Sequence, residues 1–452
     1  MKRDMTSGKE WIHILLFTLP IMAGNLLQQL YSIIDGAIVG HYVGEHAFAA
    51  VATCHSLVFL YLSLAIGLSI GVGIVVAQYF GAGRNNELPI AIDTSLILLS
   101  ICGLVFTILG VALSEVLLRD LLGVPLSLLP DAVTYMRIYS LGLLFQFVYN
   151  GIAATLRGLG DSKATLYFLL ITMILNTALT FLFVAVIEWG VAGAAFSTVL
   201  AQFVCVAVSY GYLRKRFPYK KAEKHWDGTI AKNMTKLGLP IAIQLGIVSF
   251  GSGAMQRLAN RFYHTVPGVV AAFGAAIRLD MFIMVPIIGF QSGLASFAGQ
   301  NIGAGRLDRV RRGLKATLLM SFLTSIVVSL LFNIFAEPAI ALFGLTGNAL
   351  ILGAQQVRFV TMFFWIFAVY MAVGGVLQGA GDTVLMSVAT LTALAVRILT
   401  GYLAVHLGIL EHTAAWATIP IEFAVALIIT LIRYFTGGWK NKAVAGALQH
   451  GK

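Results

Sequence analysis

Twelve runs of mostly apolar residues, each about 20 residues or longer, fill most of this 452-residue chain. A run of that length crosses the hydrocarbon core of a bilayer as a helix. The runs lie at residues 11–38, 47–79, 90–113, 132–156, 164–187, 191–213, 237–262, 268–299, 313–335, 355–378, 384–406 and 413–435. Their connections are mostly short. We therefore predict an all-α polytopic membrane protein with twelve transmembrane helices.

The composition agrees with this prediction. Hydrophobic residues make up 59% of the chain and charged residues only 11%, whereas a soluble domain has about 25% charged residues. This excludes a soluble enzyme, a disordered protein and a secreted disulfide scaffold. The sequence contains no Walker loop, GxSxG or HExxH motif, so we expect neither an enzyme nor a resident cofactor. The three cysteines lie in apolar runs and are expected to be buried hydrophobes.

The net charge of +11 follows a topological pattern. With twelve helices, 23 of the 30 basic residues fall on one side of the membrane, many of them in the connection between Arg214 and Lys236. The positive-inside rule makes that side cytoplasmic. We therefore expect both termini in the cytoplasm, lipid as a partner, and no nucleic acid.

Three short motifs recur at nearly one spacing. Leu19-Pro20-Ile21 returns at residues 239–241, QYFGAGR at 78–84 returns as QNIGAGR at 300–306, and LRGLGD at 156–161 returns as LQGAGD at 377–382. The offsets of 220, 222 and 221 residues indicate a duplicated unit. We predict a first lobe at residues 1–213, a basic connection at 214–236, and a second lobe at 237–452.

Each repeat holds six helices, so the second repeat enters the membrane in the same direction as the first. Parallel repeats are a device of secondary transporters, which bind substrate between the two lobes and rock around it. The glycines of the repeated motifs are expected to end helices and turn the chain. Asp161 and Asp382 are expected to be the N-caps of the helices that follow.

Asp35 is the strongest functional candidate, because an ionisable group inside a bilayer is costly and usually functional. Asn25, Gln28 and Ser32 precede it on the same helix, and the four side chains fall within roughly 80° of arc. Such a stripe is typical of the wall of a water-filled cavity. An acid that caps a helix end is the alternative interpretation.

Other polar residues extend this candidate site. Asn176 and Thr180 lie one turn apart on one helix face, where they could bind a cation or glue two helices together. The run at 132–156 adds Tyr139 and Gln146 as cavity candidates and Tyr135 as an ion-coupling candidate. A place in the interfacial aromatic belt is the alternative for Tyr135. Met173 and Met284 are cavity candidates because methionine is flexible and polarisable, although ordinary packing is the simpler interpretation.

The second repeat differs from the first at the key positions. The offset of 220 places Met255 where the first repeat has Asp35, and the offset of 221 places Arg397 where it has Asn176. Gln256 and Asn260 continue a polar stripe at residues 249–260. Asp280 is an acid within the next helix, and Glu422 is a possible partner for Arg397. The alternative role for these groups is structural: they would form ion pairs that hold neighbouring helices together.

As a set, the Leu-Pro-Ile starts, the GAG turns, the LRGLGD turn and Asp35 resemble the multidrug and toxic compound extrusion (MATE) family, and most closely its DinF-like prokaryotic branch. The resemblance covers essentially the whole chain. It implies export of varied, often cationic and lipophilic compounds in exchange for H⁺ or Na⁺.

The resemblance also implies roles for particular residues. Asp35 matches the acid proposed to bind the coupling ion, Asn176 matches a helix-5 asparagine, and Pro20 matches a proline proposed to bend the first helix. The family often has a second acid where this chain has Thr180. A single carboxylate favours H⁺ over Na⁺.

Our leading hypothesis is a cation-coupled efflux antiporter in a prokaryotic plasma (inner) membrane, active as a monomer on small molecules. A flippase for a lipid-linked saccharide is the second hypothesis, since Arg137, Arg278 and Arg397 could hold a pyrophosphate. A channel fits poorly, because no selectivity-filter motif is present. A major-facilitator fold also fits poorly, because the loop after the second helix reads GAGRNNEL.

Overall fold

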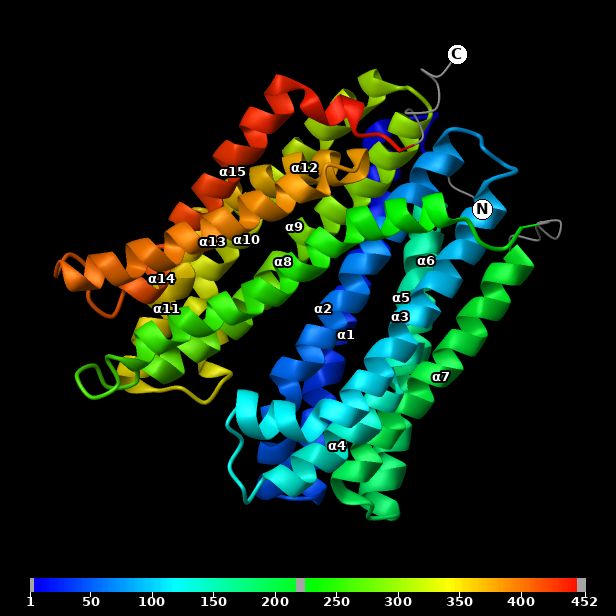
Figure 1. The fold of residues 1–452 in the computed structure, drawn as a ribbon. Helices are drawn as coiled ribbons and strands as arrows, with labels where there is room; N and C mark the ends of the chain where they lie inside the picture. Colours follow the sequence, from blue (N-terminus) through cyan, green and yellow to red (C-terminus); the bar gives the residue numbers. More distant parts are fainter. Residues whose placement is uncertain (1–3, 217–223, 445–452) are drawn as a thin grey trace. The chain divides into compact units, whose positions relative to one another are not determined.

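The computed structural model describes residues 4–216 and 224–444, and this part of the chain contains helices and no strand (Figure 1). The first repeat has these elements: α1 Glu10–Tyr42, α2 Glu45–Gly81, α3 Leu88–Val116, η1 Leu117–Leu121, α4 Leu129–Leu141, α5 Leu143–Gly158, α6 Ser162–Thr180, η2 Phe181–Val186 and α7 Gly190–Arg216. The second repeat follows with α8 Gly228–Asn260, α9 Val269–Gly303, α10 Leu307–Ala341, α11 Gly347–Met362, α12 Phe364–Ala380, α13 Thr383–His406, α14 Ala414–Ala417, α15 Ile419–Thr436 and η3 Gly438–Asn441.

The prediction of twelve spans is confirmed. Among the described residues, ten helices are long and apolar enough to cross a bilayer, and two bent pairs supply the other two spans. The bent pairs are α4 with α5, at 45°, and α11 with α12, at 50°. We had expected one continuous helix in each place. The breaks fall at Gly142 and Phe363, which are 221 residues apart, so both repeats bend at the equivalent position.

The turn motifs adopt the backbone that their glycines permit. Gly83 and Gly305 have φ of +68° and +72°, in the left-handed region that favours glycine. Asp161 caps α6, since its side chain accepts a hydrogen bond from the Ala164 backbone N–H at 3.2 Å. The expectation for Asp382 was wrong in part: it occupies the N-cap position of α13, but its side chain makes no capping bond. Its carboxylate instead accepts a 2.6 Å hydrogen bond from Arg433 Nε.

The described chain divides into two compact units. We call residues 23–245 the N-lobe, and residues 5–22 together with 246–444 the C-lobe. The divisions fall inside α1 and α8, a few residues after Pro20 and Pro240, and not in the basic connection. The first part of α1 therefore packs with the second repeat, and the first part of α8 packs with the first repeat.

Paired glycines explain this exchange of helix starts. In the N-lobe, Gly67 and Gly71 of α2 face Ala242 and Gly238 of α8 so closely that a Cβ on either glycine would meet backbone atoms. In the C-lobe, Gly289 and Gly293 of α9 face α1, where a Cβ would meet the side chains of Met22 and Thr18. Small residues four apart let membrane helices approach closely. A close contact at a pair of glycines therefore anchors each exchanged segment.

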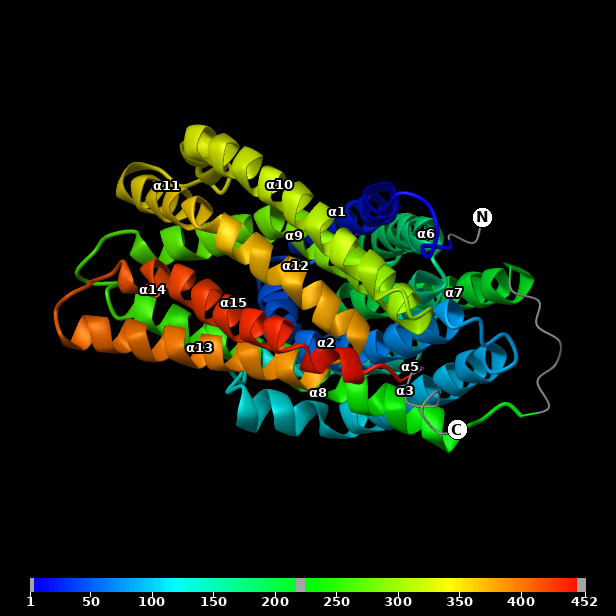
Figure 2. The same cartoon turned by 90° about the horizontal axis from the view of Figure 1, so that it is seen from above.

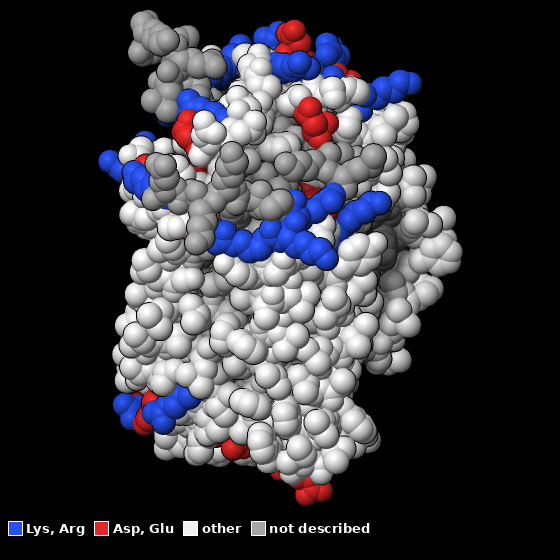
Figure 3. Space-filling model, turned by 90° about the vertical axis from the view of Figure 1, so that its right-hand side faces the viewer, with Lys and Arg blue, Asp and Glu red and all other residues white. Residues whose placement is uncertain are grey.

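The distribution of charge agrees with a membrane protein. On the face shown in Figure 3, Lys and Arg gather toward one end, and a wide band of other residues separates them from the few charges at the opposite end. In Figures 1 and 2, α13 and α15 of the C-lobe run side by side. In the N-lobe, α6 and α7 likewise contact each other. Such neighbouring pairs hold the polar clusters described next.

Candidate functional site

Asp35 lies at the end of a buried hydrogen-bond network in the N-lobe. The Thr180 hydroxyl lies 2.9 Å from Asp35 Oδ1 and 3.2 Å from Asn176 Oδ1. The Ser197 hydroxyl lies 2.7 Å from the same Thr180 oxygen. Asn176 Nδ2 donates to the Thr198 hydroxyl at 3.2 Å. Three helices, α1, α6 and α7, therefore bring five polar side chains together.

The local structure around Thr180 is unusual. The regular helix α6 ends at Thr180, and the chain continues as the π-helical turn η2. Such π-turns are rare and occur often at functional sites. Thr180 and Asn176 are 0% and 1% exposed. Their hydrogen bonds are therefore made away from water, where an unpaired polar group is costly.

The Thr180 hydroxyl has only one hydrogen, and three oxygens lie within hydrogen-bond distance of it: Asp35 Oδ1, Asn176 Oδ1 and Ser197 Oγ. An ionised Asp35 would take that hydrogen, because a hydrogen bond to a charged acceptor is the stronger one. A protonated Asp35 could donate its own hydrogen to Thr180 instead, which would release the Thr180 hydrogen to Asn176. Protonation of Asp35 can therefore change whether Asn176 receives a hydrogen bond from Thr180.

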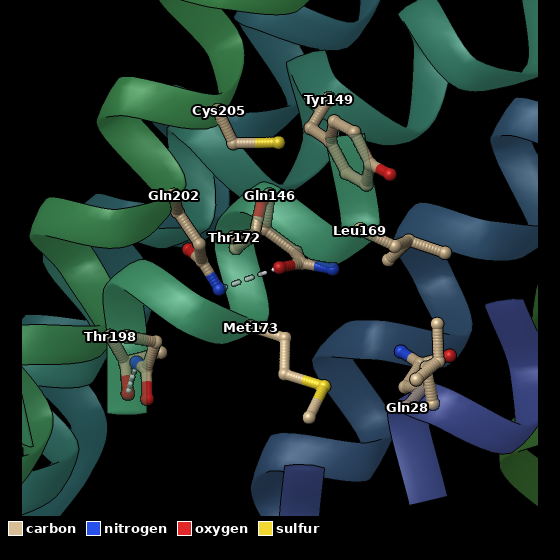
Figure 4. Close-up of a pocket in the computed structure, with 11 residues that line it drawn as sticks. Gln28, Gln146, Tyr149, Leu169, Thr172, Met173, Thr198, Gln202 and Cys205 are labelled. Atoms are coloured by element: carbon tan, nitrogen blue, oxygen red, sulfur yellow. Dashed lines mark hydrogen bonds between the residues drawn. The ribbon is translucent and has the colours of Figure 1, made fainter. Parts of the chain in front are cut away.

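A cavity of about 100 Å³ opens beside this network within the N-lobe (Figure 4). Its lining is neutral and partly polar: Leu27, Gln28, Gln146, Tyr149, Leu169, Thr172, Met173, Asn176, Thr198, Gln202 and Cys205. Gln202 Nε2 donates to Gln146 Oε1 at 2.6 Å. Asn176 and Thr198 belong both to the cavity wall and to the Asp35 network. A change at Asp35 can therefore reach the cavity through Thr180 and Asn176.

The cavity contains three of the predicted substrate residues, namely Gln28, Gln146 and Met173. Asn25 and Tyr139 are absent from its lining, and the Ser32 side chain lies outside the described residues. Tyr139 stacks on Tyr135, with ring centroids 6.0 Å apart, and both rings are buried. These two tyrosines pack within the apolar interior of the N-lobe.

Sequence reasoning missed several residues of the site. Ser197, Thr198 and Gln202 lie on α7 and complete the network and the cavity wall. Their spacing at i, i+1 and i+5 gives no clean polar stripe, and Ser and Thr are common helix glue in membranes. The polar face of α6 pointed to a partner helix but did not identify it.

The predicted residues of the C-lobe form separate groups. Gln256 Nε2 donates to Asn260 Oδ1 at 3.0 Å on α8. Met284 packs against the large apolar core of the lobe. Arg397 forms a 2.8 Å ion pair with Glu422, as suggested from the sequence, and Asp280 lies buried in the same lobe.

The arginines give little support to a basic, pyrophosphate-binding cavity. Arg397 is neutralised by Glu422. Arg137 pairs with Glu115 at 3.4 Å, and both side chains are about half exposed. Within residues 4–216 and 224–444, no group of three or more His, Cys, Asp and Glu residues could hold a metal ion.

The fold and the site together define a polytopic transporter with two repeated six-span units. A family model described as MatE matches the chain twice, over residues 20–182 and 240–403. The starts of these two matches are 220 residues apart and the ends 221, which are the offsets of the repeated motifs. The chain belongs to the MATE family, whose members are transporters and not enzymes.

Individual comparisons agree with this assignment. The chain is 32% identical over 382 residues to the probable multidrug resistance protein YpnP of Bacillus subtilis (strain 168), covering 84% of each protein. A solved outward-facing MATE transporter has a TM-score of 0.87 and 23% identity, with 97% of this chain and 99% of that chain covered. A MATE structure in complex with MaL6 has a TM-score of 0.88 at 23% identity and the same coverage. These two likenesses show the fold.

Proposed function

We propose that this multidrug efflux transporter is an antiporter that exchanges small lipophilic, often cationic compounds for H⁺. The observation that carries the proposal is the network around Asp35, which shares Asn176 and Thr198 with the wall of the N-lobe cavity. One carboxylate with hydroxyl and amide neighbours suits a proton better than Na⁺, which would need more oxygen ligands. Na⁺ remains the alternative to be tested.

The cavity would bind part of a substrate. Its volume of about 100 Å³ is below the roughly 300 Å³ at which pockets for drug-sized ligands begin. It therefore suits a single ring or a short chain of a larger molecule. Tyr149 offers a π face to a cation, and Met173 adapts to ligands of different shape. No charged residue belongs to the lining, so neutral and cationic compounds would both be accepted.

Coupling would follow from the single hydrogen of Thr180. Protonation of Asp35 would turn Thr180 toward Asn176 and change the donors and acceptors that the cavity offers. The ion can drive export only if it favours one of two conformations of the transporter. Pro20 and Pro240, which remove backbone hydrogen bonds inside α1 and α8, lie close to the points where each helix passes from one lobe to the other and would allow bending there.

The transporter would lie in a prokaryotic plasma (inner) membrane with both termini in the cytoplasm. The basic connection and the basic GAG turns support this orientation through the positive-inside rule. We further propose that one chain is a complete transporter, with lipid as its surroundings and no resident cofactor. The cavity and the Asp35 network are both formed inside a single chain.

The test uses the purified protein in liposomes with an ethidium-type dye. A proton gradient and, separately, a Na⁺ gradient are imposed on wild type, on Asp35→Asn and on Asp120→Asn. Asp120 is a matched control, because it is an exposed acid of the same lobe that pairs with Arg119 at 2.8 Å. We expect a proton gradient to drive dye uptake in wild type and in the control, and not in Asp35→Asn.

The other outcomes separate the alternatives. Dye uptake driven only by the Na⁺ gradient would show that the coupling ion is Na⁺ and not H⁺. Undiminished uptake by a folded Asp35→Asn protein would exclude Asp35 from coupling. No uptake with either gradient would contradict dye antiport and turn attention to a lipid-linked saccharide as cargo.

A further inference from the structure

A second buried polar cluster lies in the C-lobe, away from the cavity described above. Four helices contribute one side chain each: Asp280 from α9, Gln356 from α11, Arg397 from α13 and Glu422 from α15. Asp280 is 6% exposed and Gln356 is 1% exposed. The Gln356 amide and the Arg397 guanidinium are near enough to act electrostatically on the Asp280 carboxylate.

Several polar atoms of this cluster are left without partners. Among the described residues, no hydrogen bond reaches Asp280 Oδ1, Gln356 Nε2 or Arg397 Nε. Buried polar atoms are nearly always hydrogen-bonded, so each exception needs an explanation. Asp280 thus keeps an open acceptor and Gln356 an open donor on α9 and α11, two helices that pack against each other.

The charges of the cluster do not balance. Arg397 Nη1 lies 2.8 Å from Glu422 Oε2, and Arg397 Nη2 donates to the Ala415 carbonyl at 3.3 Å. One guanidinium therefore faces two carboxylates, and Glu422 already holds it. An unpaired carboxylate in an apolar interior is strongly disfavoured, and it usually binds a proton instead.

Among the described residues, Arg397 is the one charged group that acts on Asp280. Arg278, two residues earlier on α9, is exposed on another face of that helix. Tyr370 of α12 lies near Glu422, but its hydroxyl pairs with Thr390 at 2.8 Å. Arg358 of α11 pairs with Glu337 of α10 at 3.0 Å. The cluster is thus left with one negative charge in excess.

The position of the cluster within its repeat is informative. By the repeat offset of 221, Arg397 corresponds to Asn176 and Gln356 to Tyr135. Asp280 has no acidic counterpart, because the offset of 222 on α9 gives Val58. Along α9, Asp280 lies about 17 Å from the outer start at Val269, and along α1, Asp35 lies about 11 Å from the outer end at Tyr42. Asp280 therefore lies about three turns into α9 and Asp35 about two turns from the end of α1, on helices that are not equivalent in the two repeats.

We propose that Asp280 is a second proton-binding site of this transporter, with Gln356 and Arg397 as its positioning residues. A protonated Asp280 and the Gln356 amide can form a two-bond ring, in which the acid donates to Oε1 and Nε2–H donates back. An ionised Asp280 would draw Arg397 away from Glu422. The positive charge of Arg397 also disfavours Na⁺ at this place. The role of this site in coupling rests on the proposed antiport function. The binding of a proton to Asp280 does not depend on that function.

The test measures proton binding without transport. Infrared difference spectra of the reconstituted protein between alkaline and acidic pH show the carboxylic-acid C=O stretch of buried acids as they protonate. We expect one such band to be lost in Asp280→Asn and a different one to be lost in Asp35→Asn. Glu337→Gln is the matched control, because Glu337 is an exposed acid of the same lobe, and it should leave both bands in place.

Two further variants test the positioning roles. Glu422→Gln frees Arg397 for Asp280, so the Asp280 band should appear only at lower pH than in wild type. Gln356→Leu removes the amide partner and should shift the frequency of the band. Asp280→Glu should restore a band, which keeps the test decisive if the asparagine variant folds poorly.

A transport measurement then links the site to coupling. If both acids carry protons through the cycle, Asp280→Asn should lower the number of protons exchanged per substrate by half. An unchanged infrared spectrum in a folded Asp280→Asn protein would overturn the site. A lost band with unchanged stoichiometry would overturn its part in coupling, and failure of dye antiport would leave the infrared result standing.

Discussion

The two lobes share one backbone plan but carry different chemistry at the same point. In the N-lobe, Asp35 of α1 accepts a hydrogen bond from Thr180 of α6. In the C-lobe, the equivalent residues are Met255 and Gly401, and a Cβ on Gly401 would lie 3.2 Å from the Met255 methyl carbon. The same pair of helices thus meets through a hydrogen bond in one lobe and through apolar packing in the other.

The polar groups of the C-lobe come from other helices. Asp280 and Gln356 lie on α9 and α11, whereas the N-lobe network uses α1, α6 and α7. A second equivalent pair differs in charge: Tyr212 donates to Asp161 at 2.8 Å, and Arg433 donates to Asp382 at 2.6 Å. The comparison shows that the two repeats share their helix bends and helix contacts. Their ionisable residues, in contrast, occur on different helices.

Breaking the Arg397–Glu422 pair should have the largest effect on stability. Arg397→Gln leaves the largely buried Glu422 without its partner. Removing one partner of a buried ion pair costs about 3–5 kcal/mol, and the 14% and 18% exposure of these side chains places this case toward the lower end. Thermal unfolding in detergent measures the loss.

The double variant Arg397→Gln/Glu422→Gln is the control for that prediction. It removes both charges, so it should regain most of the lost stability. Asn176→Leu, at the position equivalent to Arg397, should destabilise the protein less than Arg397→Gln does, because no charge is left unpaired. Equal losses in Arg397→Gln and the double variant would show that the pair contributes shape and not charge compensation.

Much of the fold could be predicted from the sequence, because a bilayer restricts a chain so strongly. Apolar length predicted the spans, and the spacing of three motifs predicted the repeat. The bends at Gly142 and Phe363 could not be predicted, since both lie inside continuous apolar runs. The exchange of helix starts was also missed, because glycine pairs such as Gly67 and Gly71 indicate close packing but do not name the partner helix.

The site was predicted in part for a related reason. Asp35, Asn176 and Thr180 belong to the two helices whose polar faces are visible in sequence, and they do come together. Tyr135 and Tyr139 were assigned by their chemical type, but they pack in the apolar interior. Gln356 escaped notice, because the adjacent pair Gln355 and Gln356 at the start of an apolar run gives no periodic signal. The role proposed for Gln356 depends on its position near Asp280, which lies on another helix.

Removing the Thr180 hydroxyl should have an intermediate effect on coupling. Thr180→Val keeps the shape of the side chain but breaks the link between Asp35 and Asn176. The loss of a hydrogen bond to a charged group costs about 1.5–3 kcal/mol, so we expect proton-driven transport to fall roughly tenfold or more. Dye uptake in proteoliposomes measures the change.

The C-lobe supplies the control for Thr180. Gly401→Ala adds one carbon at the equivalent position and can alter only packing against Met255. It should affect stability but leave the dependence of transport on pH unchanged. A Thr180→Val protein whose pH dependence matches wild type would show that Asp35 acts without Thr180.

The smallest expected effect concerns the different ways in which α1 and α8 begin. The segment before α1 is held by Arg309, which donates to the carbonyls of Met5, Ser7 and Gly8. The start of α8 is capped by Asp227, whose Oδ1 accepts from the backbone N–H groups of Thr229 and Ile230 at 2.8 and 3.1 Å. Both arrangements include an acid, since Glu10 in the first turn of α1 pairs with Arg309 and Arg312, but only Asp227 binds the free backbone N–H groups of its helix directly.

Asp227 should therefore give a pH-dependent contribution to stability. The hydrogen bond from Lys224, followed by the Ile230 N–H, lowers the pKa of Asp227 in the folded protein. The contribution is then fully present above the unfolded pKa of about 4 and is lost as the pH falls through the lower folded value. Asp227→Ala should cost about 1 kcal/mol near neutral pH, and thermal unfolding over a pH series should show the cost shrinking under acid.

Asp227→Asn sharpens this last test. Asparagine keeps an oxygen for the two backbone N–H groups but loses the charge that faces Lys224, so its cost should be smaller than that of alanine and should not grow with pH above about 5. Substitution of Ser7, the equivalent residue before α1, should show no pH dependence, because Arg309 binds its backbone carbonyl. An equal cost of Asp227→Ala at acidic and neutral pH would mean that the cap stabilises α8 without its charge.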